Sequence, residues 1–213
     1  MSINRKIIII MILLLGIGGI SFAETYHSFS TGYYRLSDIF FKDNFGRELN
    51  GVNVNFSFYY FPGKSPMGLF IQTTFGAFTS GYEWKGDDEM DSIDYDSIAD
   101  LRIAFTPSLK LQLGPKVRIP FSLGPALCMY RENGGRSFYE AFNLGLMADT
   151  SIIFTPGRHF FLRPGVGLGW DILHVEKGEM SMSFRDTKRN RAHITPYSAL
   201  AFSLYFGVGI RFN

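Results

Sequence analysis

Residues 200–212 read LAFSLYFGVGIRF, and the alternation in this stretch decides the fold class. Every even position, from Leu200 to Phe212, carries a large apolar side chain, whereas the odd positions carry Ala, Ser, Tyr, Gly, Gly and Arg. Successive side chains of a β-strand point to opposite faces. The pattern therefore predicts a strand with one apolar face and one face that is small or polar.

The same two-residue period recurs upstream and predicts a protein made of strands. It is clear in residues 52–60, 101–113, 117–129, 142–154 and 162–172. Two more strands are predicted over residues 26–36 and 67–81, where the face of each residue is ambiguous. The sequence thus predicts eight strands, and after residue 23 it has no apolar run long enough for a transmembrane helix.

The connections between the predicted strands differ in length. Short turns rich in Pro and Gly are predicted at residues 62–66, 114–115 and 155–158. Longer polar loops are predicted at residues 36–49, 82–97, 131–138 and 174–198. Because short and long connections alternate, an up-and-down meander places all short turns at one end and all long loops at the other. Outer-membrane barrels have this layout, with short periplasmic turns and long external loops.

Residues 1–23 are predicted to be a cleaved signal peptide. Arg5 and Lys6 precede an apolar run over residues 7–15, and a small residue, Ala23, marks the expected cleavage site. An uncleaved membrane anchor is the alternative, although the run is short for one. Cleavage would leave residues 24–213 as the barrel domain. It would also change 21 basic and 19 acidic residues to 19 of each.

Charge and cysteine content exclude several classes of function. A mature chain with no net charge gives no reason to expect nucleic acid as a partner. The only cysteine, Cys128, excludes an intrachain disulfide and a metal site with several cysteines. We interpret Cys128 as a small residue that fills space inside the barrel.

Aromatic residues make up 16% of the sequence, and many fall near the ends of predicted strands. Phe, Tyr and Trp in such places anchor membrane barrels at the two interfaces. Those expected at the external interface are Tyr33, Tyr34, Tyr82, Trp84, Tyr130, Tyr139 and Tyr197. Those expected at the periplasmic interface are Tyr60, Phe61, Phe154, Phe160 and Phe161.

If the apolar faces meet lipid, the opposite faces line the lumen and bring charged residues into it. The predicted lumen charge network consists of Arg102, Lys110, Arg118, Asp149, Arg163, Asp171 and Arg211. Asp149 and Arg163 lie on adjacent predicted strands at similar depth and are expected partners. The network either fills and rigidifies the barrel or forms a basic constriction that favours anions. We favour the first hypothesis because eight strands leave room for little more than side chains.

Inward glycines keep the channel hypothesis open. They are concentrated on the last three predicted strands: Gly145, Gly165, Gly167, Gly169, Gly207 and Gly209. Without side chains, this wall either leaves a narrow wet path or relieves crowding in a curved sheet. Tyr59 and Phe78, from the second and third predicted strands, are expected to fill part of the space.

The sequence resembles the small eight-stranded outer-membrane barrels, a group that includes the OmpX, OmpA transmembrane-domain and OmpW-like families. The resemblance covers residues 24–213 and rests on the architecture described above. Members of these families usually end in an aromatic residue that the barrel-assembly machinery reads. Ile210 and Phe212 match this C-terminal assembly signal, although Asn213 follows them. The resemblance implies an all-β, up-and-down transmembrane barrel in the outer membrane of a diderm bacterium.

A soluble eight-stranded barrel of the lipocalin type is the competing fold. Its apolar face would point inward, and its outward face would need abundant Lys and Glu. The polar faces of the predicted strands are instead rich in Gly, Ala, Ser and Asn. This composition favours the membrane barrel.

Two predicted loops carry opposite charge. Residues 83–96 are strongly acidic and residues 175–194 are mainly basic, with apolar Met180, Met182 and Phe184 among them. The two loops could pair over the barrel mouth, the acidic loop could bind a divalent cation, or the charges could simply be solvated. The apolar residues could contact a membrane or a partner, or extend the barrel hairpin.

No arrangement of residues predicts catalysis. Some barrels of this size modify lipid A with a histidine, a serine and an acidic residue at the external rim. His27 and His159 map to the periplasmic end, and neither His174 nor His193 has a serine at a suitable spacing. We therefore predict no catalytic residues, no cofactor and no bound metal.

The function predicted from the sequence is a structural or surface-interaction role through the external loops. A narrow porin-like channel for small anionic or hydrophobic solutes is the first alternative, and a lipid A-modifying enzyme the second. The expected partners are outer-membrane lipid, the barrel-assembly machinery and an external ligand or host-surface partner. We expect a monomer.

Overall fold

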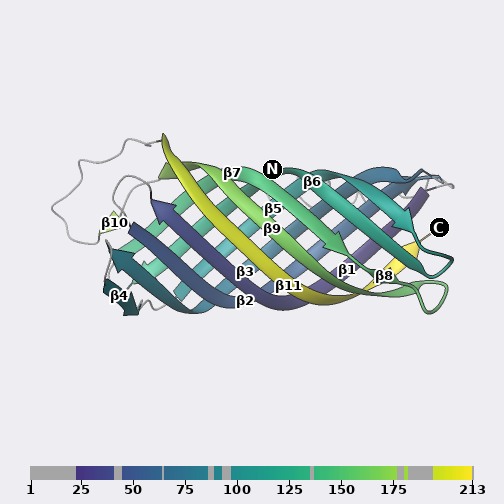
Figure 1. Cartoon of the computed structure of the whole chain (residues 1–213), viewed down its shortest axis with the longest axis horizontal. Coiled ribbons are helices and arrows are strands. Elements are labelled where there is room, and N and C mark those ends of the chain that lie inside the picture. Colours follow the sequence, from purple (N-terminus) through teal and green to yellow (C-terminus); the bar gives the residue numbers. More distant parts are fainter. Residues whose placement is uncertain are drawn as a thin grey trace, which may run out of the picture.

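Eight long antiparallel strands form a closed barrel in the computed structural model of the chain (Figure 1). The structure describes residues 23–40, 45–63, 65–85, 89–92, 97–134, 137–176, 180–181 and 194–212. The predicted signal peptide lies outside these residues, apart from Ala23 at its end. The all-β fold class predicted from the sequence is confirmed.

The long strands contain 15 to 19 residues each. They are β1 (Ala23–Phe40), β2 (Phe45–Pro62), β3 (Met67–Lys85), β5 (Ser97–Gln112), β6 (Val117–Gly134), β7 (Ser137–Ser151), β9 (Phe160–Glu176) and β11 (Ile194–Phe212). Three short strands extend the sheet: β4 (Glu89–Ser92), β8 (Ile153–Phe154) and β10 (Met180–Ser181). About ten tilted residues suffice to cross a bilayer, so every long strand extends beyond it.

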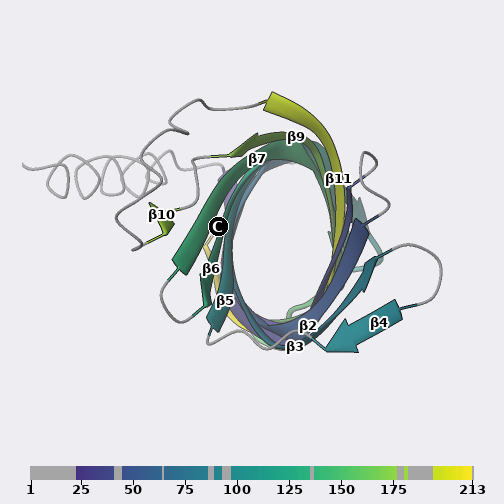
Figure 2. The same cartoon turned by 90° about the vertical axis from the view of Figure 1, so that its left-hand side faces the viewer.

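Each long strand pairs with its neighbours in the sequence, and β1 closes the barrel by pairing with β11. This last ladder runs from Thr25↔Phe212 to Ile39↔Ser198. Viewed from one end, the long strands form a continuous ring (Figure 2). Closure pairs the backbone of every long strand on both sides, which is what a sheet needs to enter lipid.

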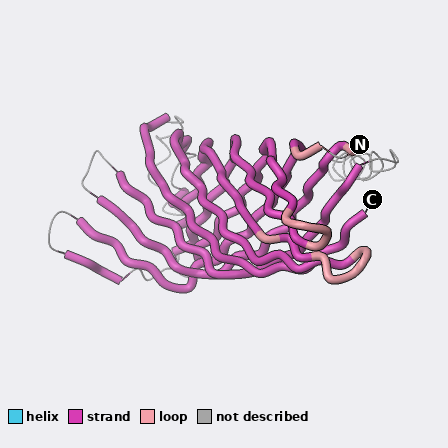
Figure 3. Tube along the Cα trace, turned by 45° about the vertical axis from the view of Figure 1, so that its right-hand side comes forward, coloured by secondary structure: helices cyan, strands magenta, loops and turns pink. Residues whose placement is uncertain are grey.

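The two ends of the barrel differ. The short turns after β2, β5 and β8 lie at the end where β1 begins and β11 finishes, which we call the short-turn end (Figure 3). At the opposite end, which we call the long-loop end, β3 and β9 finish and β5 and β11 begin.

Two of the four predicted long loops are wrong. The β1–β2 ladder continues to Phe40↔Phe45, and the β6–β7 ladder continues to Gly134↔Ser137. The strands therefore occupy most of residues 36–49 and 131–138. Polar residues end an apolar pattern but do not end a hydrogen-bonded ladder, because a strand beyond the bilayer needs no apolar face.

The outside of the barrel is apolar along every long strand. Phe206 on β11 is 54% exposed, Val52 on β2 is 54% exposed and Leu168 on β9 is 55% exposed. A soluble barrel would bury these side chains inside, so the lipocalin alternative is wrong. An exterior of this kind is stable only when lipid replaces water around it.

The inside of the barrel is lined by polar and aromatic residues. The buried residues of β1 and β3 show which positions of these two strands face the lumen, which the sequence left ambiguous. On β1 the even positions face inward, including Tyr26 and Tyr34, which are 0% and 2% exposed. On β3 the even positions from Phe70 to Phe78 do the same, and beyond Phe78 a register shift in the β2–β3 ladder turns the even position Tyr82 outward. The expected inward direction of Phe78 is confirmed.

The aromatic residues divide between the two faces, so the expectation that they all anchor the interfaces is partly wrong. Tyr33, Tyr82 and Trp170 are exposed toward the long-loop end, as are Phe154 and Phe160 toward the short-turn end. In contrast, Tyr34, Tyr130, Phe61 and Phe161 are buried in the lumen. The side chains of Trp84, Tyr139 and Tyr197 lie outside the described residues. Much of the aromatic surplus therefore fills the barrel.

Candidate functional site

Charged side chains occupy the lumen at three levels, and each level is a separate cluster. The seven charged residues predicted for the lumen all lie on its side of the sheet, and six of them are at most 7% exposed. We name the clusters the Arg163 layer (Tyr59, Asp149, Arg163 and Tyr205), the Arg102 layer (Asp100, Arg102 and Asp171) and the Glu24 layer (Glu24, Lys110, Arg118 and Arg211).

The Arg163 layer crosses the lumen between four strands. Arg163 Nη2 on β9 donates to Asp149 Oδ1 on β7 at 2.7 Å and contacts the Tyr205 hydroxyl on β11 at 2.7 Å. The Tyr205 hydroxyl donates to the other carboxylate oxygen of Asp149 at 2.7 Å. Tyr59 on β2 donates its hydroxyl to Asp149 Oδ1 at 3.0 Å. Both oxygens of the buried carboxylate therefore have donors.

Every guanidinium nitrogen of Arg163 has a partner. Nε donates to Ser151 Oγ at 3.1 Å, and Nη1 donates to Ser57 Oγ at 2.6 Å. The guanidinium carbon also lies 5.0 Å and 4.8 Å from the ring centroids of Tyr59 and Tyr205. A fully buried charge is tolerated only when it is paired and hydrogen-bonded. Arg163, at 0% exposure, meets both conditions.

Aromatic rings pack between the Arg163 layer and the short-turn end. Tyr59 stacks on Phe70 with ring centroids 4.4 Å apart, and Tyr26 meets Phe161 edge to face at 5.4 Å. These rings form one cluster with Phe61 and Ile153, and all six residues are 0% exposed. The cluster fills this half of the lumen with side chains.

The Arg102 layer lies in the half of the lumen toward the long-loop end. Arg102 on β5 donates from Nη1 and Nη2 to the two carboxylate oxygens of Asp171 on β9, at 2.6 Å and 2.9 Å. Asn143 donates to Asp171 Oδ2 at 3.3 Å. Asp100 lies 3.7 Å from Arg102 Nη2 and accepts a hydrogen bond from the Tyr34 hydroxyl. One cation therefore serves two carboxylates in this layer.

The Arg102 layer is less completely bonded than the Arg163 layer. Arg102 Nε is buried without a hydrogen-bond partner in the described structure. Beside Arg102 is a cavity of about 10 Å³, also lined by Tyr34, Thr74, Gly167 and Ser203. A space of this size holds about one water molecule. It is far too narrow for a hydrated ion.

The Glu24 layer lies at the short-turn mouth. The Glu24 carboxylate on β1 pairs with Lys110 on β5, with Arg118 Nη2 at 3.1 Å and with Arg211 Nε at 3.1 Å. The Tyr26 hydroxyl donates to the same carboxylate at 2.5 Å. Three cations thus converge on one anion, and a carboxylate outside the predicted charge network, that of Glu24, bridges the predicted basic constriction.

The inward glycines give room to side chains from other strands. A Cβ atom at Gly165 would lie 2.4 Å from the Tyr205 hydroxyl and 2.7 Å from Ser151 Cβ. A Cβ atom at Gly169 would lie 2.6 Å from Arg102 Nη1. At these two positions, the absence of a glycine side chain therefore leaves the space that side chains of the Arg163 and Arg102 layers occupy.

The sequence located the charged residues but not all of their partners. It placed Asp149 beside Arg163, and it placed Arg102 and Asp171 toward the same end. It missed Glu24, because this residue follows the predicted cleavage site, and Asp100, because residues near it were assigned to a loop. It also missed Tyr34 and Tyr205 as lumen donors. The inward parity of Tyr205 on β11 was a signal that could have identified it.

The four histidines form no described site. His27 on β1 packs against the rings of Phe58 and Phe212, and His159 is exposed at the short-turn end. The side chains of His174 and His193 lie outside the described residues. In the described part of the chain, no group of three or more His, Cys, Asp or Glu residues is arranged to hold a metal ion. The same part contains no helix long and apolar enough to cross a membrane.

No family model matches the sequence, and no curated protein matches it. Solved structures do match the fold. The chain superposes on Neisserial surface protein A with a TM-score of 0.57 and 10% identity, covering 88% of this chain and 97% of that one. A major outer membrane protein from Thermus thermophilus gives 0.56 and 13% identity, with 89% and 99% covered. The outer membrane protein OprG from Pseudomonas aeruginosa gives 0.52 and 9% identity, with 92% and 99% covered.

The closed ring of eight strands, the apolar exterior and the polar lumen define the class: a small outer-membrane β-barrel. At such low sequence identities, the similarity to these solved structures is evidence for the fold alone. Within the class, this particular chain is a barrel whose lumen is crossed by three ionic layers and packed with aromatic side chains.

Proposed function

We propose that the chain is a non-enzymatic outer-membrane barrel that acts by interactions at the cell surface, through the connections at its long-loop end. The observation that carries the proposal is the filled lumen. The Arg163 layer and the aromatic cluster beside it are buried, and they span the barrel from wall to wall. A solute route through the barrel would have to break these contacts. The surfaces that remain for interactions with other molecules are therefore the two ends of the barrel and its outer surface.

The loops are the part of the chain with the charge to recognise partners. Residues 83–96 are acidic and residues 175–194 are mainly basic. Opposite charges in separate loops allow the barrel to bind polyanionic and polycationic surfaces at different places. The proposed orientation puts the long-loop end outside the cell, as short periplasmic turns require. The proposed working form is a monomer.

Retention on charged matrices tests the surface role. Cells displaying the chain are passed over immobilised heparin and immobilised polylysine, and so are cells displaying variants with one shortened loop. We expect shortening of residues 177–193 to abolish retention on heparin and shortening of residues 86–96 to abolish retention on polylysine. A heat-modifiable gel shift verifies that each variant folds. Retention that is absent in the parent, or unchanged by both deletions, would contradict the proposal.

Mass spectrometry of lipid A tests the non-enzymatic part of the proposal. Lipid A extracted from cells with and without the chain is expected to have the same mass. A new lipid A species that disappears in the His174→Ala variant would show that the barrel is an enzyme.

A further inference from the structure

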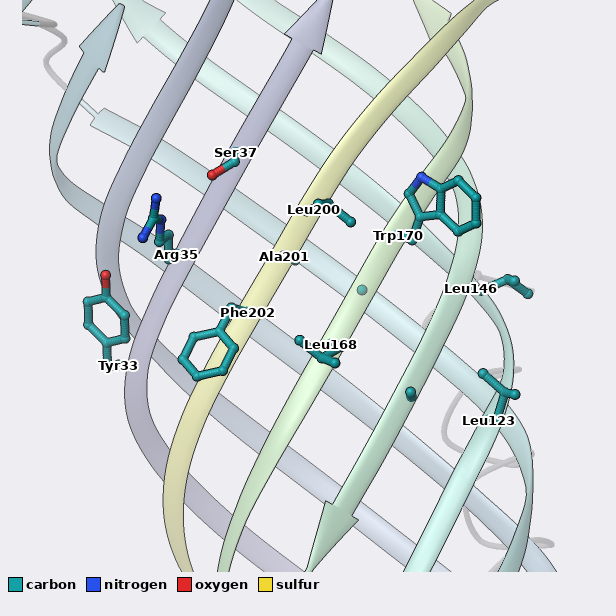
Figure 4. Close-up of a pocket in the computed structure, with 12 residues that line it drawn as sticks. Tyr33, Arg35, Ser37, Leu123, Leu146, Leu168, Trp170, Leu200, Ala201 and Phe202 are labelled. Carbon is teal, nitrogen blue, oxygen red and sulfur yellow. The ribbon is translucent and has the colours of Figure 1, made fainter.

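A groove on the outside of the barrel joins an apolar trough to a polar end that carries Arg35, which is ion-paired with Glu48. The groove has a volume of about 760 Å³ and crosses β1, β11, β9, β7 and β6. Figure 4 shows its lining, with Tyr33, Arg35 and Ser37 on β1 at one side and Leu146 and Leu123 at the other. All five of these side chains belong to the outward faces of their strands. The groove therefore opens to the lipid and not to the lumen.

The groove also climbs along the barrel. Leu123 lies six residues along β6 from Val117, at the short-turn end, whereas Arg35 lies 12 residues along β1 from Ala23. Six residues of a strand tilted by roughly 40° rise about 15 Å along the barrel axis. This rise equals half of the roughly 30 Å hydrocarbon core of a bilayer. The trough thus has the length of a single leaflet.

The end of the groove that is nearer the long-loop end has residue types that are typical of a membrane interface. Tyr33 and Trp170 are 44% and 48% exposed there, and both residue types favour the headgroup region. The Arg35 side chain remains 45% exposed while its Nη2 donates to Glu48 at 2.5 Å. A guanidinium has five donors and binds phosphate oxygens in pairs, so one bond to Glu48 leaves it able to bind an anionic headgroup.

We propose that this groove binds one outer-leaflet lipid with a net anionic headgroup. An acyl chain lies along the trough between Phe202, Leu168 and Leu146, and the phosphate group of the headgroup pairs with Arg35. The proposal depends on the outer surface and is independent of the proposed role of the loops. The cation at the polar end selects the lipid by charge, and the apolar trough orders its chain.

Trp170 lies in the groove and provides a direct probe. The sequence contains two tryptophans, so the Trp84→Phe variant leaves Trp170 as the only one. This variant is refolded into vesicles of phosphatidylcholine that contain brominated phosphatidylglycerol or brominated phosphatidylcholine. Bromine quenches tryptophan fluorescence on contact, so the ratio of quenching reports the preference for the anionic lipid at the groove. An unpaired cation near the surface predicts a preference of about fivefold, and the ion pair with Glu48 places the parent between onefold and this limit.

Three further variants in the Trp84→Phe background isolate the cause. Arg35→Gln is expected to reduce the preference to about one, whereas Glu48→Gln, which removes the competing anion, is expected to increase it. Arg158→Gln is the matched control, because Arg158 is exposed in a turn at the short-turn end. Equal quenching by the two brominated lipids in the parent would overturn the proposal. So would a preference that survives Arg35→Gln, because it would then come from general surface charge.

Discussion

The Arg163 layer and the Arg102 layer contain the same kind of ion pair in different surroundings. In the Arg163 layer, one cation meets one carboxylate, and hydroxyl groups satisfy the remaining hydrogen-bonding atoms. In the Arg102 layer, one cation meets two carboxylates, its Nε has no partner in the described structure, and a small cavity lies beside it. The comparison indicates that every guanidinium nitrogen of Arg163 is hydrogen-bonded, whereas the guanidinium of Arg102 keeps one unbonded nitrogen beside a small cavity.

The largest effect is expected from Asp149→Asn. The variant leaves the guanidinium of Arg163 buried at 0% exposure with no carboxylate among its described partners. Removing one member of a buried ion pair typically costs about 3–5 kcal/mol. Urea unfolding of the barrel refolded into lipid vesicles should show a loss in this range. A loss below about 1 kcal/mol would mean that the layer does not hold the lumen together.

A double variant gives the control for this first prediction. When Arg163→Met is added to Asp149→Leu, no uncompensated charge remains, and apolar residues of comparable size often replace a buried pair without loss. The double variant is expected to recover part of the stability lost in Asp149→Asn, because it removes the buried charge but also leaves the Tyr205 hydroxyl without its two described partners. A double variant less stable than Asp149→Asn would show that the hydroxyl contacts, and not the buried charge, determine the effect.

A smaller effect is expected from Asp171→Asn in the Arg102 layer. Here Arg102 keeps a second carboxylate, Asp100, at 3.7 Å. The loss is therefore that of a hydrogen bond to a charged group, about 1.5–3 kcal/mol. The same urea measurement orders the two variants. If Asp171→Asn destabilises the barrel more than Asp149→Asn, the proposed difference between the layers is wrong.

The smallest effects are expected from alanine at the inward glycines. Gly165→Ala would push against Tyr205 and Ser151, whereas Gly169→Ala would push against the end of Arg102, beside the small cavity. Overpacking costs about 1–3 kcal/mol, and we expect both losses in the lower half of this range, with Gly165→Ala above Gly169→Ala. Gly157→Ala, with no heavy atom within 4 Å of the new Cβ, is the matched control and should be neutral. Equal losses of stability in Gly165→Ala and Gly169→Ala would show that the Arg163 layer is not more tightly packed than the Arg102 layer.

The sequence predicted the fold well because side-chain polarity alternates along the strands, and this alternation separates the lipid-facing residues from those that face the lumen. On β11, the even positions from Leu200 to Phe212 are all apolar, so the lipid-facing side is unambiguous. On β1, in contrast, Tyr26 and Tyr34 face inward while Phe29 and Tyr33 face outward. When both faces carry aromatic rings, the pattern alone does not fix the phase of the strand.

The candidate site could be predicted only in part. The alternation along the strands placed Asp149 and Arg163 in the lumen. It did not predict their contacts with Tyr59, which lies 104 positions from Arg163 in the sequence. Such contacts cross the barrel interior, and they depend on the tilt and stagger of the strands, which a single sequence does not display. The contact between Asp100 and Tyr34, which are 66 positions apart, could not be predicted for the same reason.

Single-channel recording of the refolded protein in a planar bilayer shows whether the Arg163 and Arg102 layers close the lumen. We expect no discrete conductance steps from the parent chain in chloride salt at moderate voltage. Conductance steps from the parent, with an ion selectivity that changes in Arg118→Gln or Arg163→Met, would contradict it and make the barrel a channel.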